Sequence, residues 1–312
     1  MTDEFRLARA DELDAAFAVS ALAFQRGTVA DWAAGLDRDP WRDAGENLVA
    51  VADGRVVASV RVCARRIAGP TGGLRLAGIA NVASDPSIRR QGYIRRLLSL
   101  AHERSRAAGY DLAMLFTGVP YVYSGGAAFE TLPFWWLDLP LEGVAHPERA
   151  WRIEPLDISR HLGEMREVYD VFGRDRPGYP LRDDAFWAHP SRRVDAEWTR
   201  VALNPSGRVV AYGRVRVGAA DGQVRLGELP YLEADAARAI YADFKRDPAV
   251  AACTTLGGRM PRDHTLGTLP GASWRTYLDS MGHGYTPEGA ALLALLRESP
   301  PERAVYWTSD SF

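Results

Sequence analysis

The sequence predicts an α/β fold with a mixed sheet, repeated in two halves of the chain. In the first half, two runs with a period of two residues flank the dipeptide Asp53-Gly54, which is typical of a tight hairpin turn. A strand over Leu74–Ser84, a helix up to Ala108 and a strand over Asp111–Phe116 then indicate a strand–helix–strand crossover. A weaker copy of this order in the second half indicates a second, related domain.

The elements before the crossover follow from capping residues and hydrophobic spacing. Asp11 can cap a first helix, and Leu13, Phe17 and Leu22 give that helix a buried side. In chain order we expect helices over Asp11–Phe24 and Thr28–Leu36, strands over Asn47–Ala52 and Arg55–Val62, and a break at Gly69–Gly73. Together these elements complete the sheet that the crossover extends.

The segment Val82–Ile94 predicts an anion site, because a strand ends there, the chain turns and a helix begins. The first N–H groups of a helix have no partner within the helix and lie at the positive end of its dipole. Gly92 lacks the Cβ that would hold a phosphate away, and Arg89 and Arg90 add charged donors. The alternative is a surface turn with two solvated arginines. An apolar stripe at helical spacing should attach the helix to the sheet: Ile94, Leu97, Leu98, Ala101 and Ala108.

The second half repeats the hairpin but not the anion site. Strands are expected over Trp198–Leu203 and Arg208–Val217, then a strand within Leu226–Asp235 and a helix from about Ala236 to Arg246. At the corner where the first half has arginines and a glycine, the second has Glu233, Asp235 and a run of alanines. Two carboxylates repel a pyrophosphate, so we expect one phosphate site per chain. The alternative to a true repeat is a chance similarity of hairpins.

Composition narrows the class of protein. A chain of 312 residues fits two domains, and 47% hydrophobic with 25% charged residues is ordinary for a globular protein. The net charge of −2 and the lack of a clustered basic face argue against nucleic acid as a partner, and no apolar run is long enough for a membrane span. Cys63 and Cys253 lie in apolar strand-like runs, so we expect buried packing residues in a cytoplasmic protein. The spacing of the six histidines predicts no metal site.

The turn also carries a resemblance to a known family. Arg89–Ile94, with the sequence RRQGYI, resembles motif A of the GNAT N-acetyltransferases, Arg/Gln-x-x-Gly-x-Gly/Ala. Ile94 replaces the last small residue, as in the Eis-type (enhanced intracellular survival) branch. Leu76–Ala83 resembles the strand before the motif in that branch, and Arg176–Trp187 resembles the opening of its second domain. The resemblance spans most of residues 1–285 and implies two tandem GNAT-like folds.

The resemblance assigns limits to the domains. We expect an N-terminal GNAT domain with an acetyl-CoA site over residues 1–142, a degenerate GNAT-like domain over 150–285 and a C-terminal tail over 286–312. The join is expected near Leu141–Arg149, which is polar and contains Gly and Pro. Eis-type relatives carry a third, sterol-carrier-like domain, for which about 30 residues after the second domain leave no room.

The resemblance also assigns residues to acetyl-CoA. It implies that backbone N–H groups around Val82, Ala83 and Ser84 contact the pantetheine and the thioester carbonyl. The pyrophosphate would bind the turn formed by Arg89, Arg90, Gln91, Gly92, Tyr93 and Ile94. Thr117, at the end of the next strand, is a candidate hydrogen-bond partner of the pantetheine.

The departing thiolate needs a proton, since a thiol has a pKa near 8.5. In the family a tyrosine after the strand commonly supplies it, and Tyr123 fits that pattern, with Tyr121 as the alternative. Either tyrosine could also line a cleft without chemical function. For the base that deprotonates the amine, the Eis-type branch implies the C-terminal carboxylate, here that of Phe312. The alternative there is a disordered tail.

The sequence does not select the acceptor, which is expected to be a small-molecule amine or a lysine-containing substrate. A cationic amine is favoured near carboxylates and ring faces, so we expect aromatic and acidic groups in its cleft. The candidate aromatic residues, each with core packing as the alternative, are Phe24, Trp32, Trp41, Trp135 and Trp136. The expected function is direct acetyl transfer in a ternary complex. The alternative is a non-catalytic acyl-CoA-binding or regulatory module, and a homo-oligomer is left open.

Overall fold

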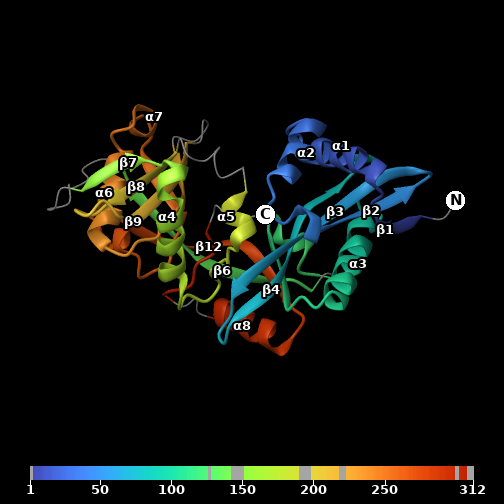
Figure 1. Cartoon of the computed structure of the whole chain (residues 1–312). Coiled ribbons are helices and arrows are strands. Elements are labelled where there is room, and N and C mark those ends of the chain that lie inside the picture. Colours follow the sequence, from blue (N-terminus) through green and yellow to red (C-terminus); the bar gives the residue numbers. More distant parts are fainter. Residues whose placement is uncertain are drawn as a thin grey trace. The chain divides into compact units, whose positions relative to one another are not determined.

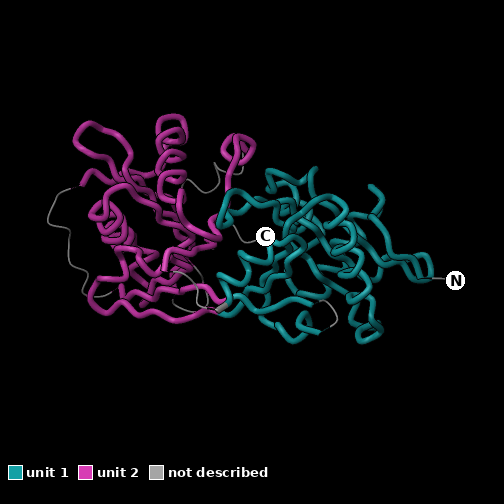
Figure 2. The backbone as a smooth tube through the Cα atoms, turned by 90° about the horizontal axis from the view of Figure 1, so that it is seen from below, with its two compact units in different colours: residues 1–132, 278–297, 312 teal, residues 133–277, 298–311 magenta. Residues whose placement is uncertain are grey.

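The computed structural model describes residues 3–125, 128–141, 151–189, 198–217, 223–298 and 302–307 (Figure 1). The chain divides into two compact units (Figure 2). Unit 1 comprises residues 1–132, 278–297 and 312, and unit 2 comprises residues 133–277 and 298–311. Each unit is described by itself.

Unit 1 contains a mixed sheet with strand order β1-β2-β3-β4-β5-β12, in which only β4 and β5 are parallel neighbours among the described pairs. Its strands are β1 (Glu4–Leu7), β2 (Glu46–Ala52), β3 (Arg55–Ala68), β4 (Gly73–Ser84), β5 (Leu112–Phe116) and the part of β12 (Ser273–Gly284) from Leu278 onward. Its helices are α1 (Leu13–Phe24), α2 (Val29–Asp37), α3 (Tyr93–Ala107) and α8 (Pro287–Glu298), with 3₁₀ turns η1 (Ala10–Glu12), η2 (Arg42–Ala44), η3 (Pro86–Ile88) and η4 (Pro120–Val122).

The sheet of unit 1 is covered on both faces, and the alternation of side chains along β2 shows how. Leu48 and Ala50 belong to the large buried cluster that contains Leu97 and Leu98 of α3. Val49 and Val51, which point to the opposite face, pack with Ala16 of α1. Helices α1 and α2 therefore cover one face and α3 the other (Figure 1).

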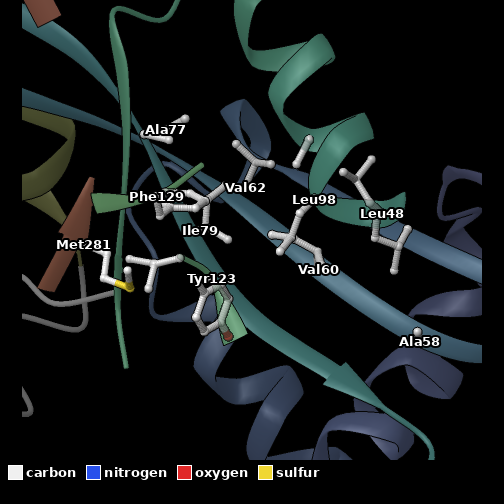
Figure 3. Packing of buried hydrophobic residues seen from close by; sticks show 14 of the residues in the cluster. Leu48, Ala58, Val60, Val62, Ala77, Ile79, Leu98, Tyr123, Phe129 and Met281 are labelled. Atoms are coloured by element: carbon white, nitrogen blue, oxygen red, sulfur yellow. The ribbon is translucent and has the colours of Figure 1, made fainter. Parts of the chain in front are cut away.

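Helix α3 packs on the sheet through most of the predicted stripe. Leu97, Leu98 and Ala101 are buried, and Ile94 packs against the same cluster, which Figure 3 shows with Tyr123 and Phe129 in it. Ala108 does not belong to the stripe, because it caps the end of the helix and is exposed. The last buried positions are instead His102 and Ser105. These two polar residues continue the helical spacing of the buried face after Leu98 and Ala101.

The strands of unit 2 have the order β7-β8-β9-β10-β11-β6, with a parallel pair β10–β11. Its strands are β6 (Glu130–Pro140) from Pro133 onward, β7 (Arg152–Pro155), β8 (Thr199–Leu203), β9 (Val209–Val217), β10 (Gln223–Glu228) and β11 (Thr255–Arg259). Its helices are α4 (Ile158–Gly173), α5 (Asp184–Ala188), α6 (Ala234–Phe244) and α7 (Pro248–Ala251), with the 3₁₀ turn η6 (Thr265–Thr268).

The two units have the same order of elements, as the sequence repeat predicts. Two antiparallel strands, β2–β3 or β8–β9, lead to a third strand, a helix and a parallel strand. The predicted limits of the domains differ from the units. Strand β6 pairs with β11 in unit 2 although it follows β5 in sequence, and β12 pairs with β5 in unit 1. The division therefore falls at Leu132 rather than at residue 142, because hydrophobic periodicity does not reveal which strands pair.

The segment predicted as a tail, residues 286–312, begins with helix α8, which belongs to unit 1 up to Arg297. Leu292 and Leu296 on α8 are buried, and so is the short stretch Ala304–Trp307 in unit 2. The predicted join at residues 141–149 lies outside the described residues apart from Leu141.

The two cysteines lie in different surroundings. Cys63 is buried on β3, as predicted, whereas Cys253 is half-buried in the turn after α7 and lies in no strand. Within the described ranges, no group of three or more His, Cys, Asp or Glu residues could hold a metal ion. No helix in this part of the chain is both long enough and apolar enough to cross a membrane.

Candidate active site

The site of unit 1 begins where β4 and β5 separate. Their parallel pairing runs from Leu76 opposite Leu112 to Gly78 opposite Met114. Beyond this point β4 continues to Ser84 and remains paired with β3, while Leu115 and Phe116 of β5 pair with β12. The edge of β4 after Gly78 thus faces a gap instead of a neighbouring strand.

A β-bulge lies in this exposed part of β4. Ser59 of β3 pairs with Ala83 and Arg61 pairs with Ala80, so β4 holds one residue more than β3 between these pairs. Asn81, inside the bulge, has a φ of 48°, in the left-handed region that non-glycine residues rarely adopt. A bulge leaves a backbone group out of the ladder and redirects the strand, and such features occur often beside active sites.

The predicted anion turn follows directly. The 3₁₀ turn η3 is capped by Asp85, and α3 begins at Tyr93 after Gly92, which has a φ of 85° and contributes no side-chain cap. Arg90 also has a positive φ, 67°. With the described residues, Arg89 and Arg90 form no ion pair, and both side chains are exposed. The turn therefore presents a helix N-terminus and two uncompensated cations at one place.

A cleft of about 720 Å³ joins the β4 edge, this turn and the segment after β5. Its volume lies in the range of about 300–1,000 Å³ that is common for small-molecule sites. The described residues that line it are Ala23, Phe24, Val82, Ala83, Ser84, Ile88, Arg89, Arg90, Gln91, Gly92, Tyr93, Ile94, Arg95, Leu98, Val119, Tyr121, Val122 and Tyr123. All of the predicted cofactor-binding residues except Thr117 are among them, as are both candidate tyrosines.

The two tyrosines differ in environment. Tyr123 follows η4, is 8% exposed and packs on Phe129 in the buried cluster, whereas Tyr121 is 77% exposed. Burial raises the pKa of Tyr123 to about 12, and a side-chain hydrogen bond with Thr117 acts in the opposite direction. At neutral pH Tyr123 therefore keeps its proton. The fixed ring favours Tyr123 over Tyr121 as a proton donor.

Three other predicted site residues are Thr117, Tyr93 and Phe312. Thr117 does not line the cleft: its hydroxyl accepts a hydrogen bond from the backbone N–H of Val119 at 3.0 Å and interacts with Tyr123. The Tyr93 hydroxyl donates to Asp3 at 3.0 Å, which raises the pKa of that phenol. Phe312, the predicted source of the base, lies outside the described residues.

Sequence reasoning left several lining residues unassigned. Phe24 was only one of five candidate aromatic residues, and it is the one that reaches this cleft. Trp135 and Trp136 lie in unit 2, and Trp41 stacks with Arg65. The expected acidic groups are not found, because no Asp or Glu occurs among the described residues that line the cleft. Arg95 is a third arginine of the cleft, and its position in the first turn of α3 after the motif could have indicated this.

The corresponding corner of unit 2 has the charge that the sequence predicts. Helix α6 begins after Glu233, and Asp235 in its first turn pairs with Arg238 at 3.2 Å. Neither glycine nor unpaired arginine lies at this helix start. This arrangement does not fit a phosphate group, in contrast to the start of α3.

Comparisons with known proteins agree with this geometry. The model of the acetyltransferase (GNAT) domain family matches residues 4–126. No curated protein sequence matches the chain.

Solved structures with a similar fold cover almost the whole chain. A probable N-acyltransferase from Enterococcus faecalis V583 aligns with a TM-score of 0.75 and 16% identity, covering 93% of this chain and 74% of the other. Eis1 from Mycobacterium abscessus aligns with a TM-score of 0.64 and 17% identity, covering 91% of this chain and 74% of the other. A tandem GNAT protein from the clavulanic acid biosynthesis pathway aligns with a TM-score of 0.56 and 14% identity, covering 92% of this chain and 99% of the other.

At these identities the solved structures establish the fold, while the family model covers the part of the chain that forms the cleft. The solved structures, which cover both units, agree with the repeated order of elements. The chain is thus a tandem GNAT-fold protein, similar in fold to Eis1, and its residues 4–126 match the model of the acetyltransferase (GNAT) domain family.

Proposed function

We propose that this protein is an N-acetyltransferase that moves the acetyl group of acetyl-CoA to a primary amine by direct attack in a ternary complex. The observation that carries the proposal is that one cleft of unit 1 brings the β4 edge, the turn Arg89–Ile94 and buried Tyr123 together. A phosphate site, a strand edge and a proton donor are the three features that transfer from a thioester requires.

Each feature has a task in the proposed reaction. Arg89, Arg90 and the N-terminus of α3 would bind the pyrophosphate. Backbone N–H groups at Val82–Ser84 would contact the pantetheine and polarise the thioester carbonyl, where negative charge develops during attack. Tyr123 would then protonate the departing sulfur. The residues fit acetyl-CoA because a Cβ at Gly92 would meet only Arg95, at 3.7 Å, so the approach to the backbone is open.

The phosphate assignment is tested by calorimetry with acetyl-CoA. The double variant Arg89→Ala/Arg90→Ala should weaken binding at least about tenfold, since a hydrogen bond to a charged group contributes about 1.5 kcal/mol or more. Arg55→Ala/Arg66→Ala is the matched control: both arginines are exposed on unit 1, lie outside the cleft lining and change the net charge equally. Equal affinity of both double variants and the parent protein would reject the phosphate turn.

The second candidate function is a non-catalytic acyl-CoA-binding or regulatory module. The exposure of Arg89 and Arg90 would serve such a module equally well. Release of free thiol from acetyl-CoA in the presence of an amine separates the two functions. Tight binding without release with any amine would favour the binding module. The role of the Phe312 carboxylate as a base is tested in the same assay by adding one residue after Phe312.

A further inference from the structure

The cleft of unit 1 has an apolar wall that the acetyl group and the phosphate turn do not need. Ten large hydrophobic side chains are exposed in the described part of the chain, and four of them line this one cleft. These four, which we call the apolar wall, are Phe24, Val119, Tyr121 and Val122. They come from the end of α1 and from the segment around η4, so two distant parts of the sequence supply one surface.

Neighbouring residues hold the Phe24 side chain in its position in this wall. Its ring, 43% exposed, stacks on Trp32 with centroids 5.4 Å apart. The Trp32 indole N–H in turn donates to the carbonyl of Arg26 at 3.2 Å. Thr28 and Asp31 form a capping box at the start of α2. The link between α1 and α2 is therefore held in shape, and an aromatic ring is kept at the cleft without being buried.

The described lining of the cleft offers no counterion to a polycationic acceptor. Arg89, Arg90 and Arg95 line it, no Asp or Glu does so among the described residues, and the Arg26 guanidinium lies 5.7 Å from the Phe24 ring. Carboxylates on the flanking segments lie outside this lining and accept hydrogen bonds from neighbours: Asp3 from Tyr93, Asp31 from Thr28 and Asp85 from Ser87. A protonated amine would find no carboxylate to pair with among these lining residues, whereas a neutral amine needs none.

The same lining residues favour an amine that is already neutral when it enters the cleft. Apart from arginines, the titratable side chains that line the cleft within the described ranges are tyrosines, so none of these residues offers a histidine or carboxylate side chain as a base. At pH 7 an amine with a pKa of about 10.4 is neutral in fewer than about one molecule in a thousand, but an α-amine with a pKa near 8 is neutral in about one in ten. A weakly basic amine therefore reaches the cleft in reactive form far more often.

From these observations, and resting on the proposed function, we infer that the acceptor is a weakly basic amine carried on an apolar body, which packs against Phe24. The neutral nitrogen attacks the thioester carbonyl, so a C–N bond forms and the C–S bond breaks. Tyr123 gives its proton to the sulfur and receives one from the nitrogen. The products are the amide and the free thiol, and the proton balance closes without a separate base.

The test compares amines that differ in one property at a time, with acetyl-CoA as donor and release of free thiol as readout. Phenylalaninamide and alaninamide share a weakly basic α-amine and differ in the apolar body, while spermine is a polycation. We expect kcat/KM for phenylalaninamide to exceed that for alaninamide by about tenfold or more, as for burial of an aromatic side chain, and spermine to be the poorest. Phe24→Ala should reduce the ratio between the two amides to near unity.

Leu22→Ala is the matched control, because Leu22 is 53% exposed on the same helix and does not line the cleft. It should preserve the ratio. Equal rates for the two amides, or a preference for spermine, would overturn the inference while leaving acetyl transfer intact. A higher rate with hexanoyl-CoA than with acetyl-CoA, lost in Phe24→Ala, would assign the wall to the acyl chain instead. Tight acetyl-CoA binding without thiol release for every amine would reject the proposed function itself.

Discussion

Tyr123 lies edge-on against Phe129, with ring centroids 6.3 Å apart and ring planes at 87°. Both rings belong to the buried cluster of unit 1 (Figure 3), and the Tyr123 side chain also hydrogen-bonds with Thr117. The phenol is thus fixed at the ring and at the hydroxyl, while one side of the residue lines the cleft. Such fixation is what a proton donor needs, since proton transfer depends on position before it depends on pKa.

Tyr123→Phe is expected to lower kcat by about a hundredfold or more, the usual contribution of a positioned acid. Acetyl-CoA affinity should stay within about twofold, because the ring and its packing remain. The measurement is thiol release at saturating acetyl-CoA, with calorimetry for affinity. Tyr121→Phe is the control and should leave kcat near that of the parent protein. A large loss in the Tyr121 variant instead would transfer the proton donor to that exposed tyrosine.

Gly92→Ala should affect both stability and binding, because an alanine is strained at a φ of 85°. We expect about 1 kcal/mol lower free energy of unfolding in urea and weaker acetyl-CoA binding. Gly54→Ala provides the control: this glycine has a φ of 75°, open surroundings and a place in the β2–β3 turn away from the cleft. It should lose the same stability and retain its affinity. Equal affinities of both variants would contradict a role of Gly92 in the phosphate turn.

The helices and strands from α1 to β5 could be predicted from the sequence, whereas β6 and β12 and their pairing were not predicted. The turn Asp53-Gly54 and the alternation in β2 are local signals, and the structure confirms the elements that they predict. That Ser280 pairs with Phe116 is a contact between residues far apart in sequence. Local periodicity does not reveal the partners of β6 and β12, because their pairing joins residues that are far apart in sequence.

The candidate site also contains residues that the sequence could predict and residues that it could not. The turn at Arg89–Ile94 and the tyrosines were identified by motif and spacing, because they lie in one continuous segment each. Phe24 reaches the cleft from α1 through the tertiary fold, and nothing in its local sequence distinguishes it from a core aromatic residue. The bulge at Asn81 was equally invisible, since it depends on a register shift against β3. Local sequence predicts functional residues that lie in one continuous segment. Which distant residues line the same cleft is determined by tertiary packing.

Arg182 and Glu228 in unit 2 form a buried pair, 1% and 2% exposed, in which the guanidinium also lies 3.9 Å from the ring of Tyr169. Removing one partner leaves a buried charge without its counterion, so Glu228→Gln should lower the free energy of unfolding by about 3 kcal/mol or more. Arg208→Gln, which breaks the exposed pair with Glu167, should cost less than about 1 kcal/mol. Chemical denaturation at pH 7 measures both. Similar losses in the two variants would show that burial of the Arg182 pair adds no coupling.

His264 should make unit 2 sensitive to mild acid. Its ring is buried, Nε2 lies 2.9 Å from the carbonyl of Leu229, and Nδ1 accepts from the N–H of Leu266 at 3.2 Å, so the folded state holds the neutral imidazole with the proton on Nε2. Burial lowers the pKa of His264 to about 4, against about 6.5 in the unfolded chain. The unfolded state therefore binds a proton first as the pH falls.

A folded pKa below the unfolded one means that the stabilisation is complete above pH 6.5 and is lost as the pH falls toward 4, by about 3 kcal/mol in all. Urea unfolding at pH 7 and pH 5, followed by a unit 2 signal such as Trp307 fluorescence, should show the difference. His264→Gln should be less stable at pH 7, because the amide reproduces the two hydrogen bonds poorly, and its stability should fall less between the two pH values. His283→Gln, in unit 1, removes an imidazole elsewhere and should retain the parent's decline. An unchanged decline in His264→Gln would mean that another group controls the acid sensitivity of unit 2.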